Sequence, residues 1–209
     1  MTEKEIQLAI EAGAAKRAER QARREALRRE AEKQAEKELD LPSDFANRLK
    51  ATWNCLEHVY YKREQMTPEL MAEVKALFLP DADDEFRYRV YEKFFHDYET
   101  LLFYAWVTSP ELCDVAFKFW DNVLQHPNAS FSGNSVVRIL GSRPNENLLK
   151  VMQHHHEKFL GGSSVFKVVL GDIIDKYVRE PGLWNFETKS FDPWTERERQ
   201  ILIEIQKLF

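Results

Sequence analysis

The chain has 209 residues, of which 44% are hydrophobic, and it contains 14 Phe, 7 Tyr and 5 Trp, so it can form one compact domain with an extension. Its 7 Gly are too few for an all-β fold, which uses glycine in its turns, or for a glycine-rich nucleotide site. The net charge of −5 arises after residue 40, and an acidic body disfavours broad nucleic-acid binding.

Residues 1–40 are predicted to form one long charged helix. They contain 10 Lys+Arg and 10 Asp+Glu, with one Gly and no Pro. At 1.5 Å per residue such a helix is about 55 Å long. Its apolar residues are mostly alanine, so it can bury little surface and is either exposed to solvent or docked on another molecule.

Four arginines of this helix recur at spacings of three and four residues: Arg17, Arg20, Arg24 and Arg28. This spacing places them on one helix face, which we call the arginine ridge. Like charges at helical spacing repel one another, by a few tenths of a kcal/mol per pair. RNA phosphates or an acidic protein groove would relieve this repulsion, and a solvated helix with acids on neighbouring faces is the alternative.

Helical patterns continue from residue 41 to residue 107. Apolar spacing predicts a helix from Phe45 to Tyr60, and the pair Thr67-Pro68 predicts the start of another that ends before Pro80. The aromatic-rich range 84–107 is predicted to be a single helix. The acids just before it lack the spacing of a calcium loop and favour a helix N-terminus instead.

The range 109–178 is predicted to contain four further helices. Ser109 and Pro110 have the residue types of an N-cap and a first helical position. Gly141 and the Gly161-Gly162 pair interrupt the apolar pattern, and Pro181 ends it. These helices read as two consecutive hairpins, so the predicted fold class is all-α.

Pro110 and Pro144 stand 34 residues apart, near the period of stacked helix pairs. The junction Gly141-Ser142-Arg143-Pro144-Asn145 has the form that closes one pentatricopeptide repeat and opens the next. Residues 109–181 therefore resemble a short, degenerate pentatricopeptide or tetratricopeptide helical-repeat protein, although Glu146-Asn147 replaces the usual Thr-Tyr opening. The resemblance implies a solenoid-like array, and it implies roles as accessory subunits of organellar assemblies or in reading single-stranded RNA.

The remaining candidate chemistry is sparse. Cys55 and Cys113 are expected to be buried, reduced thiols. In the run His154-His155-His156, successive side chains of a helix point about 100° apart, so three cannot converge on one ion and no metal site is predicted. No nucleophile with its base, carboxylate pair or phosphate loop is visible in the local sequence, so we expect neither catalysis nor a cofactor.

The C-terminal part, residues 182–209, is predicted to be an aromatic strap followed by a helix. The range 179–194 loses helical periodicity and reads as a long loop with four large aromatics, Trp184, Phe186, Phe191 and Trp194. Such a loop either packs on its own domain or anchors a partner. Thr195 and Glu198 have the spacing of a capping box for the last helix.

These patterns predict a charged helix over 1–40, a helical-hairpin domain over 41–181 and the strap over 182–209. The function they favour is a non-catalytic interaction subunit, docked into a larger protein or ribonucleoprotein assembly through the N-terminal helix and aromatic surfaces. RNA binding through the arginine ridge is the alternative, and an inhibitor that docks on one enzyme is a third. No apolar run is long enough for a membrane span. We expect an intracellular protein, cytoplasmic or in the mitochondrial matrix.

Overall fold

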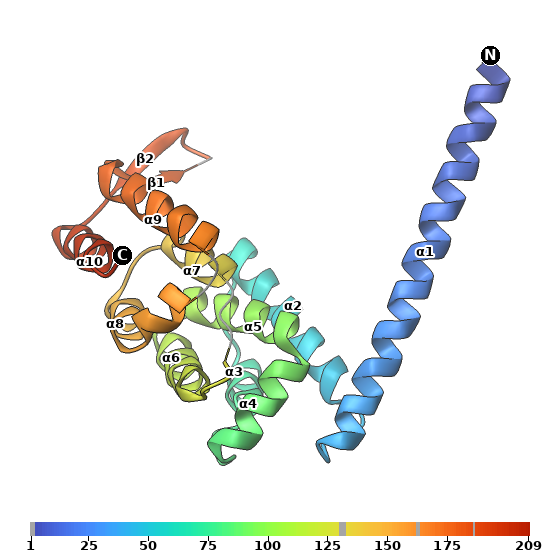
Figure 1. The fold of residues 1–209 in the computed structure, drawn as a ribbon, viewed down its shortest axis with the longest axis horizontal. Helices are drawn as coiled ribbons and strands as arrows, with labels where there is room; N and C mark the ends of the chain where they lie inside the picture. Colours follow the sequence, from blue (N-terminus) through green and yellow to red (C-terminus); the bar gives the residue numbers. More distant parts are fainter. Residues whose placement is uncertain (1–2, 130–132, 162–163, 186) are drawn as a thin grey trace. The chain divides into compact units, whose positions relative to one another are not determined.

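A computed structural model describes residues 3–129, 133–161, 164–185 and 187–209 of the chain. It separates into two compact units, Met1–Ala46 and Asn47–Phe209. The described residues form ten α-helices and one two-stranded sheet, so the fold is all-α as predicted (Figure 1). Among the described residues, no helix is both long enough and apolar enough to cross a membrane.

The first unit is dominated by one long helix, α1 (Glu3–Glu38). Every residue from 14 to 31 is exposed, whereas Ala35, Glu36 and Leu39 near the helix end are buried. One carboxylate oxygen of Glu36 accepts a hydrogen bond from the backbone N–H of Ala46, at 2.8 Å. Because the first backbone N–H groups of a helix have no intrahelical partner, Glu36 caps the next helix, α2 (Phe45–Lys62), and fixes the turn between them.

The second unit begins within α2 and continues through the helices α3 (Pro68–Leu77), α4 (Asp84–Lys93), α5 (Phe95–Thr108), α6 (Pro110–Gln125), α7 (Gly133–Leu140), α8 (Glu146–Gly161), α9 (Ser164–Arg179) and α10 (Glu196–Gln206). The predicted caps are confirmed. Thr67 and Ser109 accept hydrogen bonds from the backbone N–H groups of Leu70 and Leu112, and Thr195 forms a complete capping box with Glu198. Asp83, one of the acids before α4, caps that helix.

The last six helices pack in two layers (Figure 1). In one layer α5 contacts α7 and α7 contacts α9; in the other α6 contacts α8 and α8 contacts α10. The pairs α5–α6 and α9–α10 join the two layers. Apolar side chains at the spacing of one helix face lie between the layers and form the core, including Leu112, Trp120, Leu148 and Leu202.

The predicted single helix over 84–107 is wrong: it is two helices that meet at Phe94, whose φ of −112° and ψ of 30° end α4. The break is explained by packing, because aromatic rings on both segments contact the same residue of α6. Tyr91 and Tyr98 lie 6.2 and 5.0 Å from the Phe119 ring, between centroids.

The predicted long loop over 179–194 is also wrong, since it contains an antiparallel hairpin of β1 (Gly182–Asn185) and β2 (Ser190–Pro193). Gly182 pairs with Pro193, and a Cβ atom at Gly182 would lie 2.0 Å from the Asp192 carbonyl oxygen. Only glycine permits this approach of the two strands. Strands of four residues whose exposure does not alternate regularly cannot be distinguished from an irregular loop by sequence pattern.

Candidate functional site

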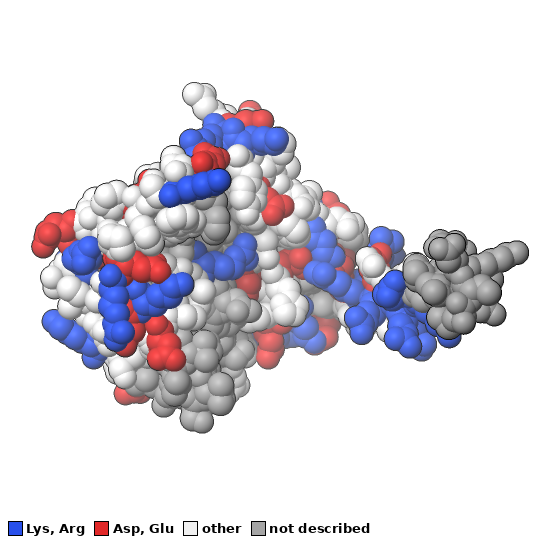
Figure 2. Space-filling view, turned by 90° about the horizontal axis from the view of Figure 1, so that it is seen from above, with Lys and Arg blue, Asp and Glu red and all other residues white. Residues whose placement is uncertain are grey.

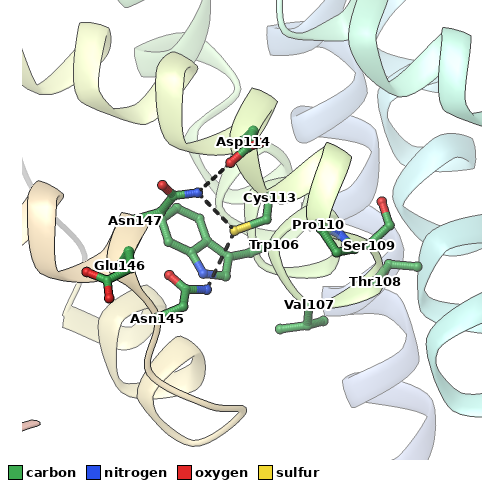
Figure 3. Close-up of a pocket in the computed structure, with 10 residues that line it drawn as sticks. All are labelled: Trp106, Val107, Thr108, Ser109, Pro110, Cys113, Asp114, Asn145, Glu146 and Asn147. Atoms are coloured by element: carbon green, nitrogen blue, oxygen red, sulfur yellow. Dashed lines mark hydrogen bonds between the residues drawn. The ribbon is translucent and has the colours of Figure 1, made fainter. Parts of the chain in front are cut away.

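A pocket of about 480 Å³ opens where the end of α5, the start of α6 and the start of α8 meet (Figure 3). Two N-caps shape its rim. Ser109 caps α6, and the side-chain oxygen of Asn145 accepts a hydrogen bond from the backbone N–H of Leu148, at 3.0 Å, to cap α8. Asn145, the last residue of the repeat-like junction, therefore has a local structural role in starting α8.

The buried thiol of Cys113 lies in this pocket and accepts hydrogen bonds from two asparagine side chains (Figure 3). The Nδ2 atoms of Asn145 and Asn147 lie 3.6 and 3.4 Å from its Sγ atom. Burial raises the pKa of the thiol; the two amide donors lower it, the Asp114 carboxylate raises it, and the net shift is upward. The thiol therefore stays protonated at neutral pH, which is the opposite of the activation that a cysteine nucleophile requires.

The prediction that Cys55 is buried is wrong, because this cysteine is exposed on α2. We expect iodoacetamide at pH 7.5 to alkylate Cys55 at least about tenfold faster than Cys113, since the thiolate and its accessibility set the rate. Peptide mass spectrometry over a time course measures both rates in one sample, and Cys113 should react quickly only after unfolding in urea. Faster alkylation of Cys113 in the native chain would contradict this account of the pocket.

The pocket also contains an unsatisfied donor. Trp106 from the end of α5 is 4% exposed, and its indole N–H has no hydrogen-bond partner among the described residues. A buried N–H without a partner costs roughly 1–3 kcal/mol. The pocket lining also includes the carboxylates of Asp114 and Glu146, and the Asp114 carboxylate accepts a hydrogen bond from the Asn147 amide.

The arginine ridge lies on α1, and Arg17, Arg20, Arg24 and Arg28 are all exposed. Arg28 pairs with Glu32, with 2.8 Å between Nε and Oε1. Figure 2 shows lysine and arginine side chains gathered along the described part of this helix. The structure therefore leaves the predicted ridge accessible to a partner.

The aromatic residues of the strap divide into two groups. Trp184 on β1 and Phe191 on β2 are paired across the hairpin, with ring centroids 5.1 Å apart, and are 41% and 37% exposed. Trp194 is buried, with its ring 6.4 Å from that of Tyr177 on α9. Phe186 lies outside the described residues. Trp194 therefore packs on the chain's own domain, while Trp184 and Phe191 are partly exposed.

Asp121 on α6 is a partner of the histidine run that no motif in the sequence indicates. His154 and His155 on α8 both contact its carboxylate on α6, whereas the ring of His156 lies near the backbone carbonyl of Gln153 on its own helix. Nothing in the local sequence of α6 indicates this pairing, since the residues are more than 30 positions apart.

No family model, curated protein or solved structure matches this chain.

Proposed function

We propose that this chain is a non-catalytic interaction subunit that docks into a larger assembly through α1. The observation that carries the proposal is the exposure of every residue from 14 to 31 of a 36-residue helix. A helix that is polar all round gains almost nothing from burial within its own chain. Contact with another molecule would account for both the length and the polar composition of α1.

The attachment of α1 supports a docking role. Its C-terminal end is fixed through the buried residues Ala35, Glu36 and Leu39 and the Glu36 cap of α2, whereas the preceding turns are exposed. The exposed turns of α1 are helical in the chain itself. This pre-ordering lowers the entropy that association would otherwise cost.

The arginine ridge indicates the chemistry of the partner. Four guanidinium groups on one face repel one another, and an anionic surface opposite them removes that repulsion. Guanidinium groups bind carboxylates in a planar, bidentate manner. The proposed partner is therefore an acidic groove or an acidic helix of another protein.

The two-layer body serves as the scaffold in this proposal. Its layers α5–α7–α9 and α6–α8–α10 are joined at each end by a helix pair, and Pro110 and Pro144 stand at the starts of α6 and α8, two helices of one layer. This arrangement supports a solenoid-like repeat, and the exposed pair Trp184 and Phe191 supplies a second, apolar contact. The raised pKa of Cys113 supports the non-catalytic part of the proposal.

The test compares the full chain with a chain that begins at Glu32, which keeps the Glu36 cap and removes the exposed turns. Both are used to capture proteins from cytoplasmic and mitochondrial extracts at equal concentration. We expect the full chain to retain a defined set of proteins and the shortened chain to lose at least about nine-tenths of it, because the removed turns form the interface. Equal capture by both chains would contradict docking through α1.

Binding of RNA through the same ridge is the second candidate, favoured by the arginine spacing alone. Nuclease treatment in the same capture experiment distinguishes RNA binding from protein binding. If nuclease releases the captured material and binding decreases steeply as salt rises, the partner is RNA and not a protein. Retention after nuclease treatment supports the protein assembly.

A further inference from the structure

The helix α8 departs from regular geometry at one residue, His155, whose φ is −124° and ψ is 18°. In a regular helix adjacent side chains point about 100° apart and cannot reach the same atom. The irregular backbone at His155 removes that restriction. His154 and His155 therefore both point to the Asp121 carboxylate on α6, which corrects the geometric premise behind the prediction of no metal site.

Three potential ligand atoms converge at this point. His154 Nδ1 lies 3.0 Å and His155 Nε2 lies 2.8 Å from Asp121 Oδ1, and all three ligand atoms lie within 4.8 Å of one another. The His155 side chain is 8% exposed and that of Asp121 is 18% exposed, while His154 is 53% exposed. The cluster is thus held between two helices on one side and reached by solvent on the other.

We propose that Asp121, His154 and His155 form a zinc site that cross-links α6 to α8. Two imidazoles and one carboxylate are ligands that Zn²⁺ prefers, and water takes the fourth, solvent-facing position. Zinc–ligand distances of about 2.0–2.1 Å in a tetrahedron place ligand atoms about 3.3 Å apart. The two nitrogen–oxygen separations of 2.8 and 3.0 Å need to widen by only a few tenths of an ångström.

The donor set selects against the commoner divalent cations. Mg²⁺ and Ca²⁺ require oxygen ligands in larger number, whereas imidazole nitrogen suits Zn²⁺. Two lysines of α8 share the helix face of His154, Lys150 four residues before it and Lys158 four residues after it. The Lys158 amine donates a hydrogen bond to the His126 carbonyl rather than to a residue of the cluster.

The cluster lies entirely within the second unit, so zinc binding is independent of docking through α1. Since α6 and α8 are neighbours in one layer, a metal that joins them stabilises the layer itself. A ligand that binds only the folded chain raises its apparent stability. Zinc is therefore expected to raise the melting temperature, and this effect should depend on the three ligands.

The test uses the full chain without an affinity tag and with Cys55→Ser, so that neither a histidine tag nor the exposed thiol binds metal. Zinc chloride is titrated against a chromogenic chelator of known affinity, and Co²⁺ absorption reports the coordination geometry. We expect one zinc ion per chain. His154→Ala and Asp121→Asn should each weaken binding by about tenfold or more, as loss of a ligand does at such sites.

His156→Ala is the matched control, because it removes the adjacent histidine of the same helix without removing a ligand of the cluster. It should bind zinc within about twofold of the parent chain and keep the rise in melting temperature. Circular dichroism without metal checks that the exposed His154→Ala variant is folded. Absence of binding at micromolar zinc, or equal loss in the His154→Ala and His156→Ala variants, overturns the site.

Discussion

Replacing Phe119 by alanine is expected to lower the free energy of unfolding by about 3–5 kcal/mol, the typical effect of removing a buried phenylalanine. Phe119 on α6 is 3% exposed. Its ring stacks on Tyr98 at a centroid distance of 5.0 Å and an interplanar angle of 9°, and it lies 5.0 Å from the Phe78 ring. The substitution leaves a cavity beside the rings of Tyr98 and Phe78, so both apolar burial and ring contacts are lost.

Urea unfolding followed by circular dichroism measures this effect. Phe191→Ala is the matched control, because it removes the same side chain from the hairpin, where Phe191 is 37% exposed. We expect the control to change the free energy of unfolding by no more than about 0.5 kcal/mol. A loss below about 1 kcal/mol for Phe119→Ala would show that the aromatic cluster is not the core of the second unit.

Helix starts were the most predictable part of this fold. Thr67, Ser109 and Thr195 each accept the backbone hydrogen bond that their residue type and position predicted. A cap depends on residues within one turn, so the necessary information is local. Apolar periodicity was similarly sufficient for α2 and α6, because one helix face meets the core.

The break at Phe94 and the irregular residue His155 were not predictable from local pattern. Neither position has a proline or a glycine, the residues that ordinarily mark a helix interruption. At Phe94 the interruption lets rings from two helices contact Phe119. At His155 it lets adjacent histidines contact Asp121. Both depend on residues that are distant in sequence.

The pocket illustrates the same limit. Cys113 was identified, but its environment depends on Asn145 and Asn147, which the fold brings from the next helix of the same layer. The sequence assigned Asn145 to a repeat junction, and the structure gives it a cap and a hydrogen bond to the thiol. By contrast, the exposure of the arginine ridge followed from α1 alone, since that helix lacks an apolar face.

Removing the arginine ridge is expected to weaken docking strongly. A chain with Arg17, Arg20, Arg24 and Arg28 all replaced by alanine loses four positive charges from one face of α1. Alanine is the strongest helix former, so the helix itself should be retained. If each guanidinium–carboxylate contact contributes about 0.5–1 kcal/mol, losing all four weakens binding by at least about tenfold.

A control must separate the effect of losing four positive charges from the effect of their position on one face of α1. The matched control replaces Arg23, Arg29, Lys33 and Lys37 by alanine, which removes the same charge from other faces of the same helix. All four are exposed, so the control should leave the fold intact. Circular dichroism of both variants verifies equal helix content.

Quantitative mass spectrometry of proteins captured by the parent chain, the ridge variant and this control is the most direct test of docking through α1. We expect the parent chain and the control to capture the same set of proteins within about twofold, and the ridge variant to capture at most about a tenth as much. Equal capture by all three chains, or equal loss in both variants, would contradict it.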